Sequence, residues 1–307
     1  MALPPAVFLL GPTASGKTRL AQELLGEPGL HFEIISVDSA QVYRGMDIGT
    51  GKSKNRVPHH LVDVRDPAEP YSAADFCQEA LCLMEEITRR GCVPLLVGGT
   101  MLYFKALRDG LAKLPEADQQ IREDILNLAR AEGWGAVHKA LQAVDPAAAA
   151  RIQPGDQQRL QRALEVYRLT GQPLSELQKS NGNPCPYRLI QIGLLPEDRG
   201  LLHRRIEERL RTMLADGFVD EVRRLYERGD LHPNLPSIKS AGYRQIWSYL
   251  AGEIDQETMF QQVLAATRQL AKRQITWMRS WKVLEIIPCL PYPDRAQALK
   301  LLRSAII

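Results

Sequence analysis

The stretch FLLGPTASGKT, Phe8 to Thr18, is the feature that most restricts what this chain can fold into. The apolar run Ala6–Leu10 leads into a loop that fits the pattern G-x-x-x-x-G-K-[ST]. Such a loop needs a strand before it and a helix after it, because its glycines turn backbone N–H groups onto anionic oxygens at a helix N-terminus. The stretch therefore predicts an α/β fold with a phosphate-binding loop made of Gly11, Pro12, Thr13, Ala14, Ser15, Gly16, Lys17 and Thr18.

Two side chains of this loop have specific expected roles. Lys17 is expected to neutralise the terminal phosphate, and the Thr18 hydroxyl is expected to ligate Mg²⁺. The alternative is a turn with a purely structural role. The loop does not show what happens to the phosphate, because hydrolases and kinases share it and any diphosphate fits.

Further apolar runs extend the α/β pattern. Phe32–Val37, Val93–Val97 and the segment YRLIQIGLLP are predicted as buried strands, and KVLEIIP as a last strand. Helical periodicity predicts helices at Gly16–Leu25, Ser72–Arg90, Ile121–Glu132, Ala136–Ala143, Ala147–Ile152, Asp156–Thr170, Gly200–Asp216, Val219–Arg228, Ser240–Leu250 and Thr258–Trp281. Strands that alternate with helices favour a parallel sheet.

The strand signal stops in the middle of the chain, from about Pro115 to Thr170. We therefore predict a parallel-sheet core of the P-loop NTPase type, formed by residues 1–116 and 187–307 with a helical C-terminal region. Residues 117–186 are predicted as a helical insertion.

Composition narrows the class of protein. A net charge of +3 does not by itself demand a nucleic-acid partner, so the local distribution of charge matters more. The five cysteines form no C-x-x-C pair, which favours buried reduced thiols and a reducing compartment. No apolar stretch approaches a membrane span, so we expect a cytoplasmic protein without membrane contact.

Asp38 ends the second predicted strand and has three interpretations. It resembles the aspartate that holds Mg²⁺ in P-loop enzymes, it suits a general base at the carboxyl end of a parallel strand, and it suits a helix or turn cap. The residues after it, with Ser39, Gln41 and Tyr43 among several glycines, are typical of a loop around a bound ring. The third strand ends in Gly98-Gly99-Thr100 instead of the aspartate of a motor ATPase, so that class is disfavoured.

Strings along nearly the whole chain resemble the family of bacterial tRNA dimethylallyltransferases, also called tRNA isopentenylpyrophosphate transferases. The resemblance covers about Val7 to Arg279 and rests on GPTASGKT, ISVDSAQVYRGMDIGT, HHLVDVRDP, YSAADF, VGGTMLYFKAL, QRLQRALEVY, SAGYRQIW and TRQLAKRQITWMR. It implies that the loop holds the diphosphate of dimethylallyl diphosphate. The dimethylallyl group then moves to the exocyclic amine of the adenosine just 3′ of the anticodon, in tRNAs that read codons beginning with U.

The resemblance also implies the roles of the catalytic residues. Asp38 corresponds to the base that removes the amine proton, while Thr13, Lys17, Arg209 and Mg²⁺ on Thr18 take up charge on the diphosphate. A guanidinium suits that role because it binds phosphate oxygens with two parallel hydrogen bonds. From the residues alone, Arg209 reads instead as a surface cation paired with nearby glutamates.

Binding of tRNA requires a local basic surface, because the target adenosine must be flipped out of the anticodon loop. Arg159 and Arg162 share one helical face, and so do Arg268, Lys272 and Arg279, while the interleaved tryptophans are predicted to be core residues. For the face that carries Arg159 and Arg162, the alternative is a solvent-exposed helix surface that binds no nucleic acid. The resemblance implies a monomer that contacts the tRNA anticodon stem-loop through Asp38, Ser39, Ala40, Gln41, Thr100, Arg122, Gln158, Arg159, Leu160, Gln161, Arg162, Lys239, Ser240, Ala241, Gly242, Tyr243, Arg244, Lys272, Arg273, Gln274, Ile275, Thr276, Trp277, Met278 and Arg279.

Three other functions compete with this one. The loop alone also suits a small-molecule kinase. A prenyltransferase acting on free adenine nucleotides shares the chemistry, although a mononucleotide needs neither a helical insertion nor a basic C-terminal segment. A non-catalytic RNA-binding protein would need neither the complete loop nor Asp38.

Overall fold

The computed structural model describes residues 3–52, 58–179 and 182–306. The chain forms two compact units, one made of Met1–Ala106 with Pro186–Ile307 and the other of Leu107–Cys185. The second unit begins within helix α3 (Met101–Asp109), whereas the sequence suggested a boundary at residue 117. The linker between α3 and the next helix therefore belongs to the second unit.

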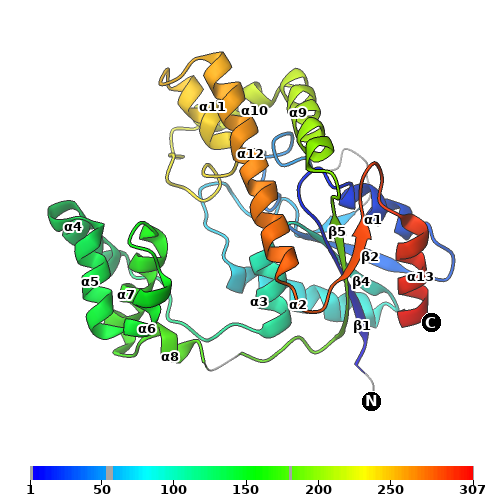
Figure 1. Ribbon diagram of the computed structural model, residues 1–307, viewed down its shortest axis with the longest axis horizontal. Helices are drawn as coiled ribbons and strands as arrows, with labels where there is room; N and C mark the ends of the chain where they lie inside the picture. Colours follow the sequence, from blue (N-terminus) through cyan, green and yellow to red (C-terminus); the bar gives the residue numbers. More distant parts are fainter. Residues whose placement is uncertain (1–2, 53–57, 180–181, 307) are drawn as a thin grey trace. The chain divides into compact units, whose positions relative to one another are not determined.

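A six-stranded sheet forms the centre of the first unit (Figure 1). Its order is β3-β2-β4-β1-β5-β6, and every pair of neighbours is parallel. The strands are β1 (Pro5–Leu10), β2 (Phe32–Val37), β3 (His59–His60), β4 (Val93–Gly98), β5 (Arg188–Leu195) and β6 (Glu285–Pro288). This confirms the predicted α/β class.

Helices cover both faces of the sheet, which explains why the strands read as continuous apolar runs. On one face α1 (Lys17–Leu25) and α13 (Arg295–Ile306) pack on alternate residues of the central strands, such as Val7 and Leu9. On the other face lie α2 (Ala73–Arg89) and α3, where the Phe8 and Phe104 rings are 5.0 Å apart.

Four further helices of the first unit pack against one another. They are α9 (Arg199–Ala215), α10 (Phe218–Tyr226), α11 (Tyr243–Leu250) and α12 (Gln256–Arg279). The last of these is the longest, and it begins at a side-chain cap in which Asp255 accepts a hydrogen bond from the Thr258 N–H group. α12 brings residues far along the chain back to the central strands.

The second unit is entirely helical within its described residues. It contains α4 (Gln119–Glu132), α5 (Trp134–Val144), α6 (Pro146–Arg151), α7 (Gln157–Thr170) and α8 (Leu174–Leu177). Asp118, Asp145 and Asp156 cap three of these helices, and Gly171 ends α7 in a left-handed conformation. A separate apolar core, which includes Ile125 and Leu141, holds the helices together.

Most predicted elements match within a few residues, and the differences have local causes. The helices α3, α8 and α13 were not predicted from the sequence. α11 begins at Tyr243 and not at Ser240, since Gly242 adopts a φ of 92°. Among the described residues, no helix is long and apolar enough to cross a lipid bilayer.

We expect Leu160→Ala to lower the free energy of unfolding by about 2–5 kcal/mol, because Leu160 is 0% exposed within the second core. Chemical denaturation followed by circular dichroism measures this loss. Leu169→Ala on the same helix is the matched control, since Leu169 is 36% exposed and its truncation should change stability by about 0.5 kcal/mol or less. Equal losses for the two variants would contradict the assignment of Leu160 to the core.

Candidate active site

The carboxyl ends of three neighbouring strands form the base of the site. β4 lies between β2 and β1, so Asp38 after β2, Thr100 after β4 and the phosphate-binding loop after β1 meet at one edge of the sheet. A cavity of about 510 Å³ opens there, lined by these residues and by α9, α11 and α12. A second cavity of about 510 Å³ adjoins it, and both are lined by Lys17, Thr18, Asp38, Gln41 and Arg209.

The phosphate-binding loop has the tight backbone that its glycines predicted. Ala14 and Gly16 have φ values of 63° and 85°, and the Gly11 N–H group donates to the Gly98 carbonyl at 3.2 Å. A Cβ atom on Gly11 would lie 2.6 Å from the Ser15 hydroxyl. That hydroxyl is buried and has no hydrogen-bond partner within the described part of the chain, which is uncommon for a buried polar group.

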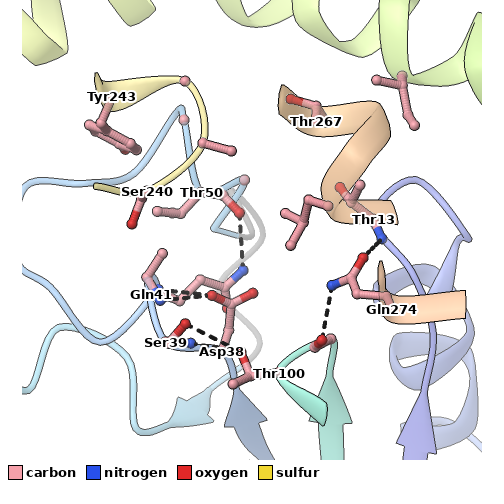
Figure 2. Close-up of a pocket in the computed structure, with 18 of the residues that line it drawn as sticks. Thr13, Asp38, Ser39, Gln41, Thr50, Thr100, Ser240, Tyr243, Thr267 and Gln274 are labelled. Atoms are coloured by element: carbon pink, nitrogen blue, oxygen red, sulfur yellow. Dashed lines mark hydrogen bonds between the residues drawn. The ribbon is translucent and has the colours of Figure 1, made fainter. Parts of the chain in front are cut away.

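Gln274 of α12 joins this loop to the end of β4. Its Oε1 atom accepts a hydrogen bond from the Thr13 N–H group at 2.9 Å, and its Nε2 atom donates to the Gly99 carbonyl at 2.9 Å (Figure 2). The side chain is almost fully buried. The Thr13 N–H group is therefore already used, and Thr13 lines the cavity by its remaining atoms.

Two cations, Lys17 and Arg209, line both cavities. Burial lowers the pKa of Lys17 to about 8; the nearby Asp38 carboxylate opposes this shift and the Arg209 guanidinium adds to it. Burial also lowers the pKa of Arg209, again against the effect of Asp38. In the residues that the structure describes, no hydrogen bond or ion pair engages the Arg209 guanidinium, so the surface ion pair suggested by its neighbours is wrong. This arrangement is suited to a bound anion.

Asp38 is held by its own turn. Its Oδ1 atom accepts from the N–H groups of Ala40 at 2.9 Å and Gln41 at 3.3 Å, while the Thr100 hydroxyl accepts from the Ser39 N–H group at 3.0 Å (Figure 2). These bonds use one carboxylate oxygen. Among described residues, the Oδ2 atom has no hydrogen-bond donor, which leaves it available to a substrate.

Gln41 connects Asp38 to the following loop. Its Oε1 atom accepts from the Ser36 hydroxyl at 2.9 Å, and its Nε2 atom donates to the Thr50 carbonyl at 3.3 Å. The loop Asp47–Gly51 lines both cavities, and a Cβ atom on Gly51 would lie 2.0 Å from the Arg209 guanidinium. Close packing of this loop thus determines where the arginine lies.

Glu221, which was not predicted from the sequence, holds the loop Asp47–Gly51 in place. Its carboxylate is 2% exposed and accepts from the N–H groups of Asp47, Ile48 and Gly49 at 2.7–3.2 Å, and from the Tyr243 hydroxyl at 2.6 Å. Burial and the Glu221 charge raise the pKa of Tyr243, which keeps its hydroxyl protonated as a donor. A signal existed: Glu221 lies on the apolar face of α10, three residues after Phe218 and four before Leu225.

The cavity brings together many of the predicted site residues. Its lining includes Thr13, Lys17, Thr18, Asp38, Ser39, Ala40, Gln41, Thr100, Arg209, Lys239, Ser240, Ala241, Gly242, Tyr243, Arg273, Gln274 and Trp277. Arg244, Lys272, Thr276 and Arg279 lie outside it, and all four are exposed on the surface of α11 or α12. Of the three residues predicted to form one basic face, Lys272 and Arg279 are exposed, while Arg268 is half-buried and donates a hydrogen bond to Glu207.

Some residues predicted to contact tRNA are buried and do not line the cavity. Leu160 lies in the core of the second unit, and Ile275 and Met278 face inward from α12. Their prediction as contact residues was too broad, because they were included as parts of continuous segments. Their side chains instead pack their helices against the rest of the unit.

The arginines predicted to bind tRNA in the second unit are already paired. Arg122 and Arg162 both donate to Glu165, whose carboxylate is buried, and Arg162 also donates to the Pro115 carbonyl. Burial acts to raise the pKa of Glu165, but the hydrogen bonds from the two arginines outweigh it and the net shift is downward. Arg159 is exposed and pairs with Asp156, and Gln158 is exposed as well.

A model of the IPP transferase family matches residues 41–281. The chain belongs to this family. Among solved structures, it is 36% identical to the full-length tRNA isopentenylpyrophosphate transferase of Bacillus halodurans, with a TM-score of 0.70 and coverage of 98% of this chain and 95% of that one.

Two further solved structures are similar. The tRNA delta(2)-isopentenylpyrophosphate transferase of Staphylococcus epidermidis is 31% identical, with a TM-score of 0.69 and coverage of 99% and 98% of the two chains. A eukaryotic dimethylallyltransferase acting on tRNA is 27% identical, with a TM-score of 0.72 and coverage of 90% of this chain and 70% of that one.

We expect binding of dimethylallyl diphosphate to weaken about tenfold between pH 7 and pH 9. The Lys17 ammonium, whose pKa is about 8 in the free protein, loses its proton over that range, and only its charged form attracts the ligand. Isothermal titration calorimetry at several pH values measures the effect. Lys17→Met should bind weakly at every pH with no such step, and a flat profile for the unsubstituted protein would contradict the expectation.

Proposed function

We propose that this protein transfers the dimethylallyl group from dimethylallyl diphosphate to the exocyclic amine of the adenosine immediately 3′ of the anticodon, in tRNAs that read codons beginning with U. One observation carries the proposal: a single cavity is lined both by the diphosphate loop with Lys17 and Arg209 and by the available carboxylate of Asp38. Family membership and the tRNA-acting relatives agree with it.

The leaving group determines the role of the loop. As the bond between the allylic carbon and the bridging oxygen breaks, negative charge grows on the diphosphate. Lys17 and Arg209 line the cavity without competing carboxylate partners other than Asp38, so their charge is available to that oxyanion.

The nucleophile determines the role of Asp38. The lone pair of an adenine amine is delocalised into the ring, so the amine attacks well only if it loses a proton as the new C–N bond forms. The free Oδ2 atom of Asp38 accepts that proton and passes it to solvent, while its Oδ1 atom stays bonded to Ala40 and Gln41. The products are N6-dimethylallyladenosine and diphosphate.

Apolar side chains complete the cavity. Ile206, Leu210, Met213, Phe218, Val263 and Leu270 all line it. Such walls suit a five-carbon prenyl group and reduce the access of water, which would otherwise attack the allylic carbon.

Mg²⁺ is part of the proposal, and the donor set is compatible with it. Thr18 lines both cavities with Asp38, but the described residues contain no cluster of three or more His, Cys, Asp or Glu side chains suited to a metal. Mg²⁺ usually keeps few protein ligands and binds substrate phosphates, so Thr18 together with the diphosphate would hold it. The ion would supply further positive charge to the leaving group.

The surface of α11 and α12 supplies cations for the tRNA backbone. Lys239, Arg244, Lys272, Arg273 and Arg279 are exposed there, and phosphate contacts of this kind position a nucleic acid without reading its sequence. We further propose that the second unit binds the anticodon stem-loop through Arg122, Gln158, Arg159, Gln161 and Arg162, and that the protein acts as a cytoplasmic monomer.

Label transfer tests the reaction. Unmodified tRNA is incubated with the enzyme, Mg²⁺ and radiolabelled dimethylallyl diphosphate, in parallel with free AMP as acceptor and with gamma-labelled ATP as donor. We expect label in tRNA only from the prenyl donor. Label on AMP would replace the proposal with nucleotide-level prenylation, and label transferred from ATP would replace it with a kinase.

Asp38→Asn should lower kcat by about 100-fold or more, because the amide keeps the shape and the turn but does not accept a proton. Single-turnover prenylation measures the rate, and filter binding should show unchanged tRNA affinity. The matched control is Asp220→Asn, which removes an exposed carboxylate on α10 and should leave kcat unchanged. Unchanged turnover of Asp38→Asn would remove Asp38 from the role of base.

A further inference from the structure

Gln274 lies in a segment that the family resemblance assigns to tRNA contact, yet both polar atoms of its amide are hydrogen-bonded inside the protein. Both of its hydrogen bonds, to the Thr13 N–H group and to the Gly99 carbonyl, are 2.9 Å long and join segments more than 170 residues away in the chain. Its side chain is 8% exposed. The amide therefore makes one hydrogen bond through each of its polar atoms to the protein itself, which ties its orientation to the loop and the strand end.

We propose that Gln274 is a positioning residue for diphosphate binding, which fixes the phosphate-binding loop at Thr13 against the end of β4. This inference rests on the proposed function for its substrate, while its binding test needs no prenyl transfer. The Thr13–Gln274–Gly99 bridge is visible on one side of the cavity, opposite Asp38 and Gln41 (Figure 2).

The Gln274 amide packs closely against Gly99 and the phosphate-binding loop. A Cβ atom on Gly99 would lie 2.3 Å from the Gln274 Nε2 atom and 3.2 Å from the Gly11 carbonyl oxygen. The glycine therefore lets the amide approach the strand end and the loop together. The same loop carries the left-handed Ala14 and the buried Ser15 hydroxyl, so a shift at Thr13 would change the positions of the donors that follow it.

The chemistry of the bridge requires an amide. Thr13 offers a donor and Gly99 offers an acceptor, so the bridging side chain must accept at one atom and donate at the other. A carboxylate would lose the bond to Gly99 and add negative charge beside the diphosphate loop. A thioether of similar length would lose both bonds and leave two buried backbone groups without partners.

α12 carries residues for two different proposed roles, tRNA contact on its exposed face and positioning of the phosphate-binding loop on its inward face. Lys272 and Arg273, two residues and one residue before Gln274, are exposed cations, whereas Gln274 faces inward. Substitution of Gln274 should therefore affect the diphosphate and spare tRNA, and substitution of Lys272 should do the reverse.

The experiment measures two affinities on the full-length protein. Inorganic diphosphate with Mg²⁺ is titrated by calorimetry, and tRNA binding is followed by fluorescence anisotropy. For Gln274→Met and Gln274→Glu we expect diphosphate affinity to fall about tenfold or more, which is the effect of losing one or two buried hydrogen bonds, with tRNA affinity within about twofold. Gln269→Met, an exposed glutamine on the same helix, should change neither.

Steady-state kinetics and a second variant complete the test. The KM for dimethylallyl diphosphate should rise about tenfold, with a smaller change in kcat. Gly99→Ala displaces the same amide from the other side and should reproduce the loss, which keeps the proposal testable if Gln274→Met folds poorly. Lys272→Gln should weaken tRNA binding alone.

The outcomes separate this inference from the proposed function. The inference would be overturned if the Gln274 and Gly99 variants bound diphosphate with wild-type affinity, or if they lost affinity for tRNA alone. This holds even if prenyl transfer is observed. Weakened diphosphate binding in a protein that transfers no prenyl group to tRNA would support the positioning role and overturn the proposed function instead.

Discussion

Parallel pairing of β2, β4 and β1 is the constraint on which the site depends. Because β4 lies between the other two strands, the carboxyl ends of all three lie at one edge of the sheet. The diphosphate loop, Asp38 and Thr100 follow these ends directly, so their separation is set by strand spacing and not by flexible chain. The proposed base and the proposed leaving-group site are thus brought to one cavity by the backbone hydrogen bonds of the sheet.

The helices that follow β5 supply the other half of the cavity. Arg209 comes from α9, and the buried Glu221 of α10 gathers three backbone N–H groups of the loop Asp47–Gly49 together with the Tyr243 hydroxyl. Removing one partner from such a network leaves buried polar groups unsatisfied, which is costly. This network therefore explains how a loop that contains several glycines keeps a defined position beside Arg209.

The sequence identified local features best. A strand, a glycine loop and a helix are contiguous, so the phosphate-binding loop could be predicted with its boundaries, and the apolar runs predicted four of the buried strands. Arg209 was recognised only through the family resemblance, because its neighbours on α9 include glutamates that read as surface partners. Leu160, Ile275 and Met278 were grouped with contact residues since they stand in otherwise polar segments, whereas packing buries them.

By itself, the sequence determined the α/β class, the phosphate-binding loop and the position of Asp38 at a strand end, because each follows from periodicity or from residues a few positions apart. Only the tertiary structure decided the roles of Gln274, Glu221 and Glu165. The partners of Gln274 and the backbone partners of Glu221 lie more than 170 residues away along the chain, and those of Glu165 include Asp118 and Arg122 more than 40 residues away. The physical reason is that a buried polar side chain is defined by the groups that satisfy it, and folding alone brings those groups within hydrogen-bond distance.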